Sequence, residues 1–500
     1  MSQRSPRLRR LRWCGLLMAA AAIAAMPGTA AARTLGSLQF TACTLTNAAS
    51  ADSVEAQCAT LSVPENRDAP EGRHIDLAVA WVPAREDAAP DPVFMLAGGP
   101  GQSARDSYPG IARAFAEVGK RHHIILVDQR GTGDSNRLIC TNAAGESAVM
   151  EEGEESPEAA RAFAVRCRDQ LAAKADLRFY STTDAIQDLD AVREAIAAAQ
   201  IDLVGISYGT RVAQQYAARY PRRTRSVVLD SPAPNELMLG SDHARNLEAS
   251  LDLQFARCTA LPACAERFGD PRQQLRDLLV QIREAPPLVS YRDPVTGAWR
   301  EDRFDEASLV TLVRLFAYAP MAAAMLPLTL HDAANGHPES LVALANLVGS
   351  QMSEQIMHGM QLSVMCTEDA DGLQASAEDA GSVLGTALIG LLKEQCAVWP
   401  RGTLPVDFHA PFRSDLPVLV LAGEFDPVTP PRYGEQIVAG LSRGRLLVLR
   451  GQGHNVIPVG CMPKLLARYI DTADAPGLDA SCLDNLPYAP PFAGYYGWEP

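Results

Sequence analysis

The protein has 500 residues, of which 47% are hydrophobic and 21% are charged. This composition is ordinary for globular proteins, so it excludes wholesale disorder and a polytopic membrane protein. The formal net charge of -14 offers no basic surface to neutralise phosphates, which argues against nucleic acid and anionic membranes as partners. At this length we expect several domains, or one large domain with an insertion.

Residues 1–32 have the pattern of a secretory signal. Arginines between positions 4 and 12 precede an apolar segment from Cys14 to Met26, and Ala30–Ala32 offers a small-residue cleavage site before Arg33. The apolar segment is shorter than the ~20 residues that a membrane-spanning helix needs, although a retained anchor is the alternative. We therefore expect a secreted or periplasmic protein with no stable membrane span.

The remaining cysteines also suit an oxidising compartment. Of the 11 cysteines, only Cys14 lies in the predicted signal, so an even number stays in the mature chain and can pair in disulfides. Buried free thiols are the alternative for several of them. No C-x-x-C or H-E-x-x-H motif occurs, so we expect no zinc site. Nearest neighbours in sequence give the pairs Cys43–Cys58, Cys140–Cys167, Cys258–Cys264, Cys366–Cys396 and Cys461–Cys482.

Short apolar runs alternate with helical patterns in much of the chain. Helical patterns span 182–200 and 210–220, and several of the apolar runs are typical of strands buried on both faces. Alternation of this kind predicts a mostly parallel α/β sheet. The predicted strands are 76–83, 92–97, 124–128, 203–206, 226–229, 417–422 and 445–449.

The alternation stops near Pro234, and helical patterns dominate residues 236–400. We interpret this interval as a helical cap inserted into an α/β core made of residues 33–235 and 401–500. The cap helices are predicted at 246–268, 271–283, 306–319 and 339–358.

The chemistry starts with the pentapeptide Gly205-Ile206-Ser207-Tyr208-Gly209, which follows a predicted strand and opens a predicted helix. In this context a G-x-S-x-G sequence indicates a nucleophile elbow, in which small flanking residues leave the serine hydroxyl exposed on a tight turn. Ser207 is therefore the candidate nucleophile.

A serine hydroxyl needs a histidine to accept its proton and a carboxylate to orient that histidine. His454 lies in the loop after the last predicted strand, and Asp426 follows the strand before it, 28 residues upstream. Strand ends on one edge of a parallel sheet share a site, so these residues supply the order Ser, acid, His. Glu424 is the competing acid, but Asp426 lies farther into the loop.

Two backbone amides are needed to stabilise the oxyanion of the reaction. One belongs to the residue after the nucleophile, Tyr208. The second is expected after an early strand, where Gly98-Gly99-Pro100-Gly101 follows the run 92–97. Because Pro100 has no amide hydrogen, we favour Gly99 as the donor, with Gly98 as the alternative.

Taken together, several segments resemble the secreted tripeptidyl aminopeptidases and proline iminopeptidases of the α/β-hydrolase fold. The match is weakest in the predicted cap, and proline iminopeptidases usually carry His where this chain has Ala97. The segments are Gly98–Gly101, Asp128–Ser135, Gly205–Thr210 and Gly423–Pro430, while Val364–Asp369, Cys461 and Cys482 look like the tripeptidyl branch.

The resemblance implies a serine aminopeptidase that cleaves peptides near a free N-terminus, releasing proline or a tripeptide, without a metal or an organic cofactor. Such an enzyme needs carboxylates to bind the substrate ammonium, because a buried ammonium without a partner is costly. Glu368 and Asp369 are the candidates for this role. A carboxylesterase acting on small acyl esters is the main alternative, since the same triad serves both reactions. A non-catalytic binding protein is the second alternative.

Overall fold

A computed structural model describes residues 32–143, 145, 147, 148 and 156–498 of the chain. Apart from its last residue, the predicted signal lies outside this part of the chain. Among the described residues, no helix is both long enough and apolar enough to span a membrane.

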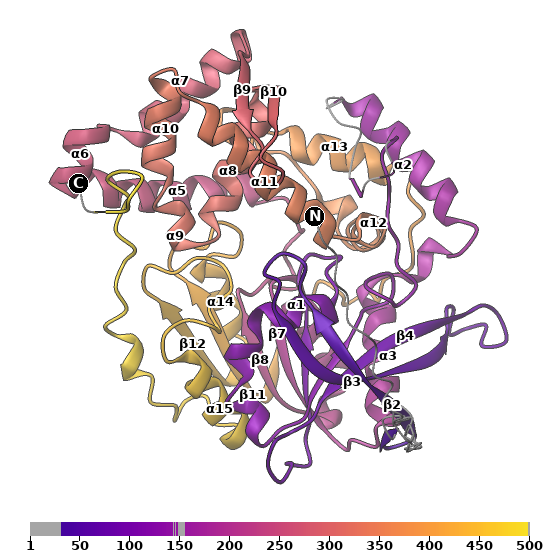
Figure 1. The fold of residues 1–500 in the computed structure, drawn as a ribbon. Coiled ribbons are helices and arrows are strands. Elements are labelled where there is room, and N and C mark those ends of the chain that lie inside the picture. The colour runs from indigo at the N-terminus through magenta and orange to yellow at the C-terminus, as the bar shows by residue number, and fades with distance from the viewer. Residues whose placement is uncertain (1–31, 144, 146, 149–155, 499–500) are drawn as a thin grey trace, which may run out of the picture. The chain divides into compact units, whose positions relative to one another are not determined.

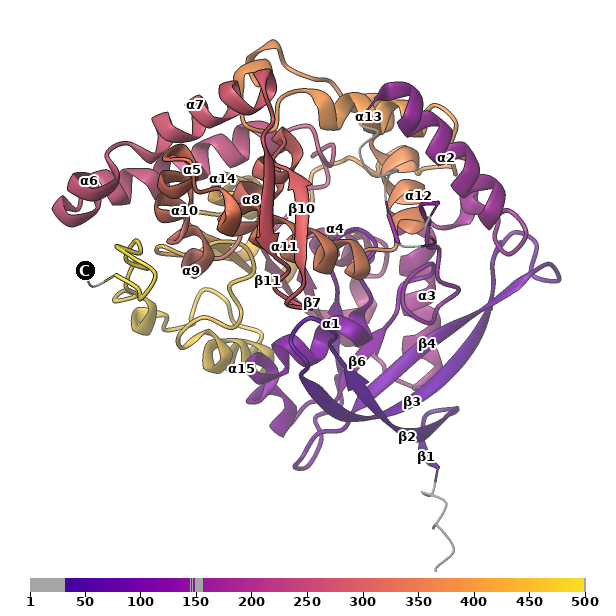
Figure 2. The same ribbon diagram turned by 45° about the horizontal axis from the view of Figure 1, so that its top comes forward.

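A mixed β-sheet forms the centre of the described fold, with the strand order β1-β2-β3-β4-β6-β5-β7-β8-β11-β12 (Figures 1 and 2). Neighbours from β6 to β12 in this order are parallel, whereas β1 to β4 and the β4–β6 pair are antiparallel. The predicted parallel α/β sheet is thus confirmed. The strands are β1 (Arg33–Leu35), β2 (Leu38–Thr46), β3 (Ser53–Pro64), β4 (His74–Val82), β5 (Val93–Leu96), β6 (Ile124–Val127), β7 (Ile201–Ile206), β8 (Thr224–Asp230), β11 (Ser414–Gly423) and β12 (Leu441–Leu449).

Both faces of the central strands are buried, because consecutive strand residues point to opposite sides of a sheet. In β8, Val227 packs into one hydrophobic cluster and the next residue, Val228, into another. One cluster lies under helices α3 and α4, and the second lies under α1 and α15. These helices are α1 (Ala104–Ile111), α3 (Thr182–Ala195), α4 (Tyr208–Arg219) and α15 (Met462–Thr472), and α14 (Pro431–Val438) connects β11 to β12.

A group of helices with a hydrophobic cluster of its own lies at the top of Figure 1. It includes a two-stranded hairpin, β9–β10, that the sequence patterns did not predict. The elements are α5 (His243–Thr259), α6 (Pro262–Phe268), α7 (Pro271–Glu284), β9 (Leu288–Arg292), β10 (Trp299–Arg303), α8 (Glu306–Ala317), α9 (Pro320–Ala323), α10 (Leu326–Ala334) and α11 (Glu339–Gln355).

The last two helices of the predicted cap interval pack differently. Helices α12 (His358–Glu368) and α13 (Ala387–Cys396) join the hydrophobic cluster of the sheet, together with α2 (Pro157–Leu171). The interval 236–400 therefore contributes to three hydrophobic clusters: that of the sheet, that of the cap helices, and a small one made of Cys258, Cys264, Phe268 and Leu328.

Two predicted helices are shorter than expected, each for a local reason. The predicted helix 246–268 is divided, because Pro262 has no amide hydrogen and begins the new helix α6. The predicted helix 339–358 ends at Gln355, and the amide of Met357 donates to the carbonyl of Gly101 at 2.9 Å. This hydrogen bond attaches the segment to the loop after β5.

The structure contains all five predicted disulfides, which confirms the pairing of nearest neighbours in sequence. The bond Cys366–Cys396 joins α12 to α13, and the bond Cys461–Cys482 joins the start of α15 to the C-terminal segment. The others are Cys43–Cys58, Cys140–Cys167 and Cys258–Cys264.

Candidate active site

Ser207 occupies the turn between β7 and α4 with φ 55° and ψ -123°, a conformation that non-glycine residues rarely adopt. The turn is so tight that a Cβ on Gly205 would lie 2.4 Å from the carbonyl oxygen of Gly209. A Cβ on Gly209 would lie 2.3 Å from the carbonyl oxygen of Leu96, at the end of β5. Both glycines of the motif are thus required by close backbone approach.

Asp426 and His454 are in direct contact. The Nδ1 atom of His454 lies 2.8 Å from Oδ2 of Asp426, whose side chain is fully buried. Three further donors hold this carboxylate: the amides of Val428 and Thr429, both at 2.8 Å, and the Thr429 hydroxyl at 3.0 Å. The carboxylate therefore has a fixed orientation toward the imidazole.

Glu424, the competing acid, has other partners. Its carboxylate accepts hydrogen bonds from the amide of Gly451 at 2.7 Å and from the hydroxyl of Tyr488 at 3.3 Å. Tyr488 also stacks on Phe425, with ring centroids 5.6 Å apart. Glu424 thus links the loop after β12 to the C-terminal segment, while Asp426 contacts the histidine.

The end of β8 connects the serine turn to the histidine loop. The amide of Ser207 donates to the carbonyl of Asp230 at 2.9 Å. The carboxylate of Asp230 accepts from the amides of Val456 and Ile457, both at 3.0 Å, just after His454. Asp230 therefore holds both segments of the site at once. Sequence reasoning missed this residue, although a charged residue at the end of a buried apolar strand is a signal for it.

Ser231 strengthens the same connection, because its hydroxyl accepts from the amide of Asn455 at 2.8 Å. Its own amide donates to the carbonyl of Leu421 in β11 at 2.9 Å. The loop that carries His454 is thus attached to two adjacent residues at the end of β8.

The charges around His454 favour its protonated form. Burial opposes a positive charge, but the carboxylates of Asp426 and Asp230 outweigh burial and raise the pKa of His454 above its ordinary value. Burial likewise acts to raise the pKa of Asp426, yet His454 and the loop amides lower it overall. Burial raises the pKa of Asp230 to about 6, against the opposing effect of the amides that it binds.

The glycine loop after β5 lies against the serine turn. A Cβ on Gly98 would lie 3.1 Å from Cβ of Ser207 and 2.9 Å from the side-chain oxygen of Gln102. Gly99 has φ 104°, which glycine adopts without strain. Tyr208 is the first residue of α4, where backbone amides have no acceptor within the helix. The two predicted oxyanion donors thus belong to segments that flank Ser207.

Glu368 and Asp369 lie away from solvent, against a buried arginine. The guanidinium of Arg211 in α4 contacts Asp369 at 3.0 Å and Glu368 at 3.5 Å, and all three side chains are fully buried. Burial raises the pKa of Glu368 to about 7 despite the positive charge of Arg211. In this arrangement both carboxylates already have a cationic partner, and a substrate would reach them only if the cluster opened.

Glu368 also connects to the residue after the nucleophile. Its carboxylate accepts from the amide of Thr182 at 2.6 Å, and the hydroxyl of Thr182 lies 2.6 Å from the hydroxyl of Tyr208. Gln129 donates to the same tyrosine hydroxyl at 3.0 Å. This buried network fixes the Tyr208 side chain at the start of α4.

Helices α5 and α8 contact the loops that hold the acid and the histidine. The amide of His454 donates to the carbonyl of Tyr318 at 2.8 Å, and the two rings meet edge to face at 5.2 Å. From α5, the hydroxyl of Ser250 donates to the carbonyl of Phe425 at 2.6 Å. A Cβ on Gly453 would lie 2.1 Å from the Tyr318 carbonyl oxygen, so this approach requires glycine.

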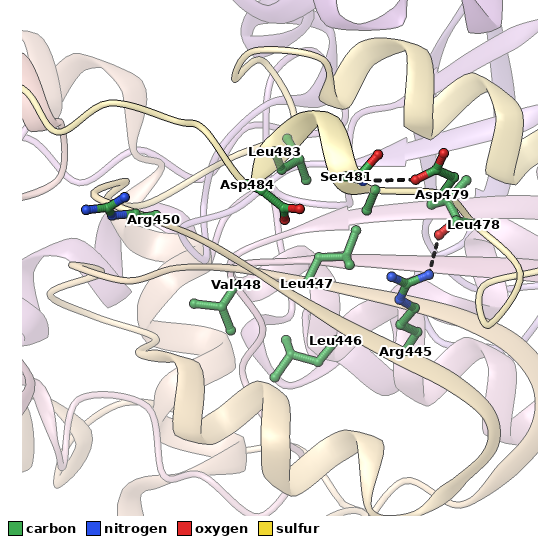
Figure 3. Close-up of a pocket in the computed structure, with 11 residues that line it drawn as sticks. Arg445, Leu446, Leu447, Val448, Arg450, Leu478, Asp479, Ser481, Leu483 and Asp484 are labelled. Atoms are coloured by element: carbon green, nitrogen blue, oxygen red, sulfur yellow. Dashed lines mark hydrogen bonds between the residues drawn. The ribbon is translucent and has the colours of Figure 1, made fainter.

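An open cavity of about 610 Å³ lies elsewhere, between β12 and the chain that follows α15 (Figure 3). Its lining carries charges of both signs, including Arg445, Arg450, Asp479 and Asp484. Arg445 donates to the carbonyl of Leu478 across it. No predicted site residue lines this cavity, so it is distinct from the candidate active site.

Comparison with protein families agrees with this geometry. The family model of the alpha/beta hydrolase fold matches residues 91–262, and the family model of TAP-like proteins matches residues 382–482. The first match contains Ser207, and the second contains Asp426 and His454. The chain has the α/β-hydrolase fold, as the sequence resemblance predicted.

Individual proteins are similar over most of the chain. The serine protease Hip1 of Mycobacterium tuberculosis is 25% identical over 466 residues, which cover 85% of this chain and 87% of that protein. The tripeptidyl aminopeptidase of Streptomyces lividans is 22% identical over 476 residues, which cover 87% of this chain and 84% of that protein. These matches confirm the resemblance to the tripeptidyl aminopeptidases.

Among solved structures, the proline iminopeptidase of Mycobacterium smegmatis matches 83% of this chain and 98% of its own, with 17% identity and a TM-score of 0.40.

Proposed function

We propose that this chain is an exported serine aminopeptidase that hydrolyses peptide bonds near free N-termini through Ser207, Asp426 and His454. The similarity to proteins named serine protease and tripeptidyl aminopeptidase supports a serine hydrolase with peptidase activity. The observation that carries the proposed triad is the 2.8 Å contact between His454 and Asp426, in loops attached to the residues of β8 that also hold the serine turn.

In the proposed reaction, Ser207 Oγ attacks the carbonyl carbon of the scissile bond while His454 Nε2 takes the hydroxyl proton. Asp426 keeps the remaining imidazole proton on Nδ1, so that Nε2 is free to accept. The protonated His454 then gives its proton to the leaving amine, and the acyl-enzyme is released by water through the same steps. The amides of Gly99 and Tyr208 stabilise the oxyanion.

The requirement for a free N-terminus rests on the similarity to tripeptidyl aminopeptidases. The binding of the substrate ammonium by Glu368 and Asp369 stays a prediction, because in the described structure both carboxylates contact Arg211. When both are ionised, the two carboxylates and the one guanidinium carry a net negative charge. This charge lies in the buried network that also holds the Tyr208 side chain. This charge would attract an ammonium even without contact.

Export is part of the proposal. The five disulfides support it, since such bonds persist in oxidising compartments. Residues 1–32 are proposed as the signal that is removed. Mass spectrometry of the protein purified from the periplasm or the medium should find an N-terminus at Arg33, and full-length protein retained in the membrane would contradict this.

The reaction is tested with three substrate classes: tripeptide p-nitroanilides with a free N-terminus, the same anilides after N-acetylation, and p-nitrophenyl esters. The proposal predicts that the free anilides are hydrolysed and that acetylation lowers kcat/KM by about a hundredfold. Acetylation removes the substrate's positive ammonium, so the negative charge of the enzyme has no cation to bind. Equal rates on free and acetylated anilides would refute the aminopeptidase. Hydrolysis of the esters alone would identify a carboxylesterase instead. Ser207→Ala is the control for background hydrolysis.

A further inference from the structure

One cation beside the candidate active site lacks a counter-charge. Arg314 lies in α8, and Tyr318 directly follows the helix with helical backbone angles, so the two side chains, four residues apart, lie on the same face. Tyr318 contacts His454 through both its ring and its carbonyl oxygen. Arg314 is partly exposed, and within the described part of the chain its guanidinium has no hydrogen bond or carboxylate partner.

His243 provides an independent indication of where Arg314 lies. This residue begins α5, and its ring is largely surrounded by protein although part of the residue reaches solvent. Burial, and next the positive charge of Arg314, lower the pKa of His243 to about 3, and His454 acts in the same direction. His243 is thus within electrostatic reach of both Arg314 and His454. Because this pKa lies far below neutral pH, His243 adds no positive charge of its own beside Arg314.

The neighbouring carboxylates are already engaged. Asp426 is held by His454 and by the loop after β11, and Asp242 accepts a hydrogen bond from the Tyr433 hydroxyl at 2.7 Å and pairs with Arg245. Neither is free to neutralise Arg314. A partly desolvated guanidinium presents several donors in one plane, and a carboxylate is the anion that fits them best.

We propose that Arg314 binds a carboxylate on the leaving-group side of the scissile bond. This inference rests on the proposed aminopeptidase function and extends it to a substrate class: short peptides whose C-terminal carboxylate follows directly after the bond that is cut. His454 must reach the leaving amine to protonate it, so the residue that departs lies on the histidine side of the site. Helix α8 contacts that side through Tyr318.

The length of the substrate follows from this placement. When the leaving group is a single amino acid, its carboxylate lies two bonds from the amine that His454 protonates. When the leaving group is a longer peptide, an amide occupies that position and Arg314 gains no ion pair. The enzyme would therefore prefer peptides that extend only one residue beyond the cut, or that carry an acidic residue there.

The test uses the tripeptide whose anilide is hydrolysed best, extended by one alanine with either a free C-terminal carboxylate or a carboxamide. We expect wild-type kcat/KM to favour the free acid by about tenfold to a hundredfold, the range of a charge-assisted hydrogen bond. Arg314→Gln should reduce the ratio of acid to amide to about one. Arg303→Gln removes an exposed arginine of the hairpin strand β10 and should keep the wild-type ratio.

A measurement on the wild type alone tests the proposal even if Arg314→Gln does not fold. The ratio of acid to amide should fall as ionic strength is raised, because salt screens a partly exposed ion pair. Equal hydrolysis of acid and amide by the wild type, or a preference that survives in Arg314→Gln, would overturn the proposal. If neither peptide is cleaved although the free anilide is hydrolysed, the site for the leaving-group carboxylate is refuted while the aminopeptidase function stands. If no free anilide is hydrolysed although a fluorophosphonate labels Ser207, the proposed aminopeptidase function itself fails.

Discussion

Replacing Asp426 by asparagine tests the proposed triad in atomic detail. In the structure, Oδ1 of Asp426 accepts from the amides of Val428 and Thr429, while Oδ2 faces the Thr429 hydroxyl and Nδ1 of His454. An asparagine can keep its oxygen at the Oδ1 position, which preserves both amide contacts. Its NH₂ group then occupies the Oδ2 position, where the hydroxyl can rotate to accept from it.

The imidazole has no such freedom. Facing an NH₂ donor, Nδ1 must act as an acceptor, so the ring proton moves to Nε2, the atom that has to accept the proton of Ser207. Loss of the correct tautomer costs about 10⁴-fold in kcat in the serine proteases where it has been described, equivalent to about 5 kcal/mol of transition-state stabilisation. We expect kcat to fall by this factor in Asp426→Asn, while the protein stays folded.

The assay is kcat on a free tripeptide anilide, with urea unfolding to verify the fold. Glu424→Gln is the matched control, because it makes the same chemical change two residues away in a carboxylate that binds Gly451 and Tyr488. Its kcat should fall by less than about tenfold, the effect of one weakened hydrogen bond. The reasoning is refuted if Asp426→Asn keeps more than a hundredth of wild-type kcat, or if Glu424→Gln loses as much.

Three further predictions concern pH, packing and disulfides. Because the pKa of His454 is raised and the reaction needs its neutral form, wild-type kcat/KM should fall on the acid side at a pH above 6.5. Asp230→Asn removes one anion that raises this pKa, so its pH profile should shift to lower pH; an unshifted profile would exclude the effect. Gly209→Ala places a methyl group 2.3 Å from the Leu96 carbonyl oxygen and should lower kcat by about a hundredfold, whereas an unchanged kcat would show that the turn adapts. Replacing both cysteines by alanine in Cys366–Cys396, which have a sequence separation of 30, should lower the free energy of unfolding in urea by about 4 kcal/mol. The same change in Cys258–Cys264, which have a sequence separation of 6, should lower the free energy of unfolding by only about 2 kcal/mol. A larger loss for Cys258–Cys264 than for Cys366–Cys396 would contradict the chain-entropy argument.

The sequence predicted the central strands well, because parallel strands buried on both faces form continuous apolar runs such as 124–127. The outer strands β2 and β3 were missed for the opposite reason. Each exposes one face, so polar residues interrupt its apolar pattern. The hairpin β9–β10 contains a strand, Trp299–Arg303, with four charged residues out of five, which no hydrophobic pattern reveals.

The site shows the same division between local and tertiary signals. The elbow at Ser207 was predictable, because its strained turn and its two glycines are encoded in five consecutive residues. Asp230 carries a weak local signal, a charged residue at the end of a buried apolar strand, but its partners Val456 and Ile457 are far away in sequence. Arg314 carries no local signal, because its place beside the histidine loop depends on tertiary contacts of Tyr318. Glu368 and Asp369 were selected for their charge, whereas their contacts depend on Arg211 in another helix.

The most direct test of the account is covalent labelling with a fluorophosphonate, followed by peptide mass spectrometry. We predict a single adduct on Ser207 in the wild type, strongly slowed labelling in His454→Ala, and none in Ser207→Ala, since only a serine activated by an adjacent base reacts at a useful rate. An adduct on a different residue, or labelling of Ser207 that is equally fast without the imidazole, would contradict the proposed triad.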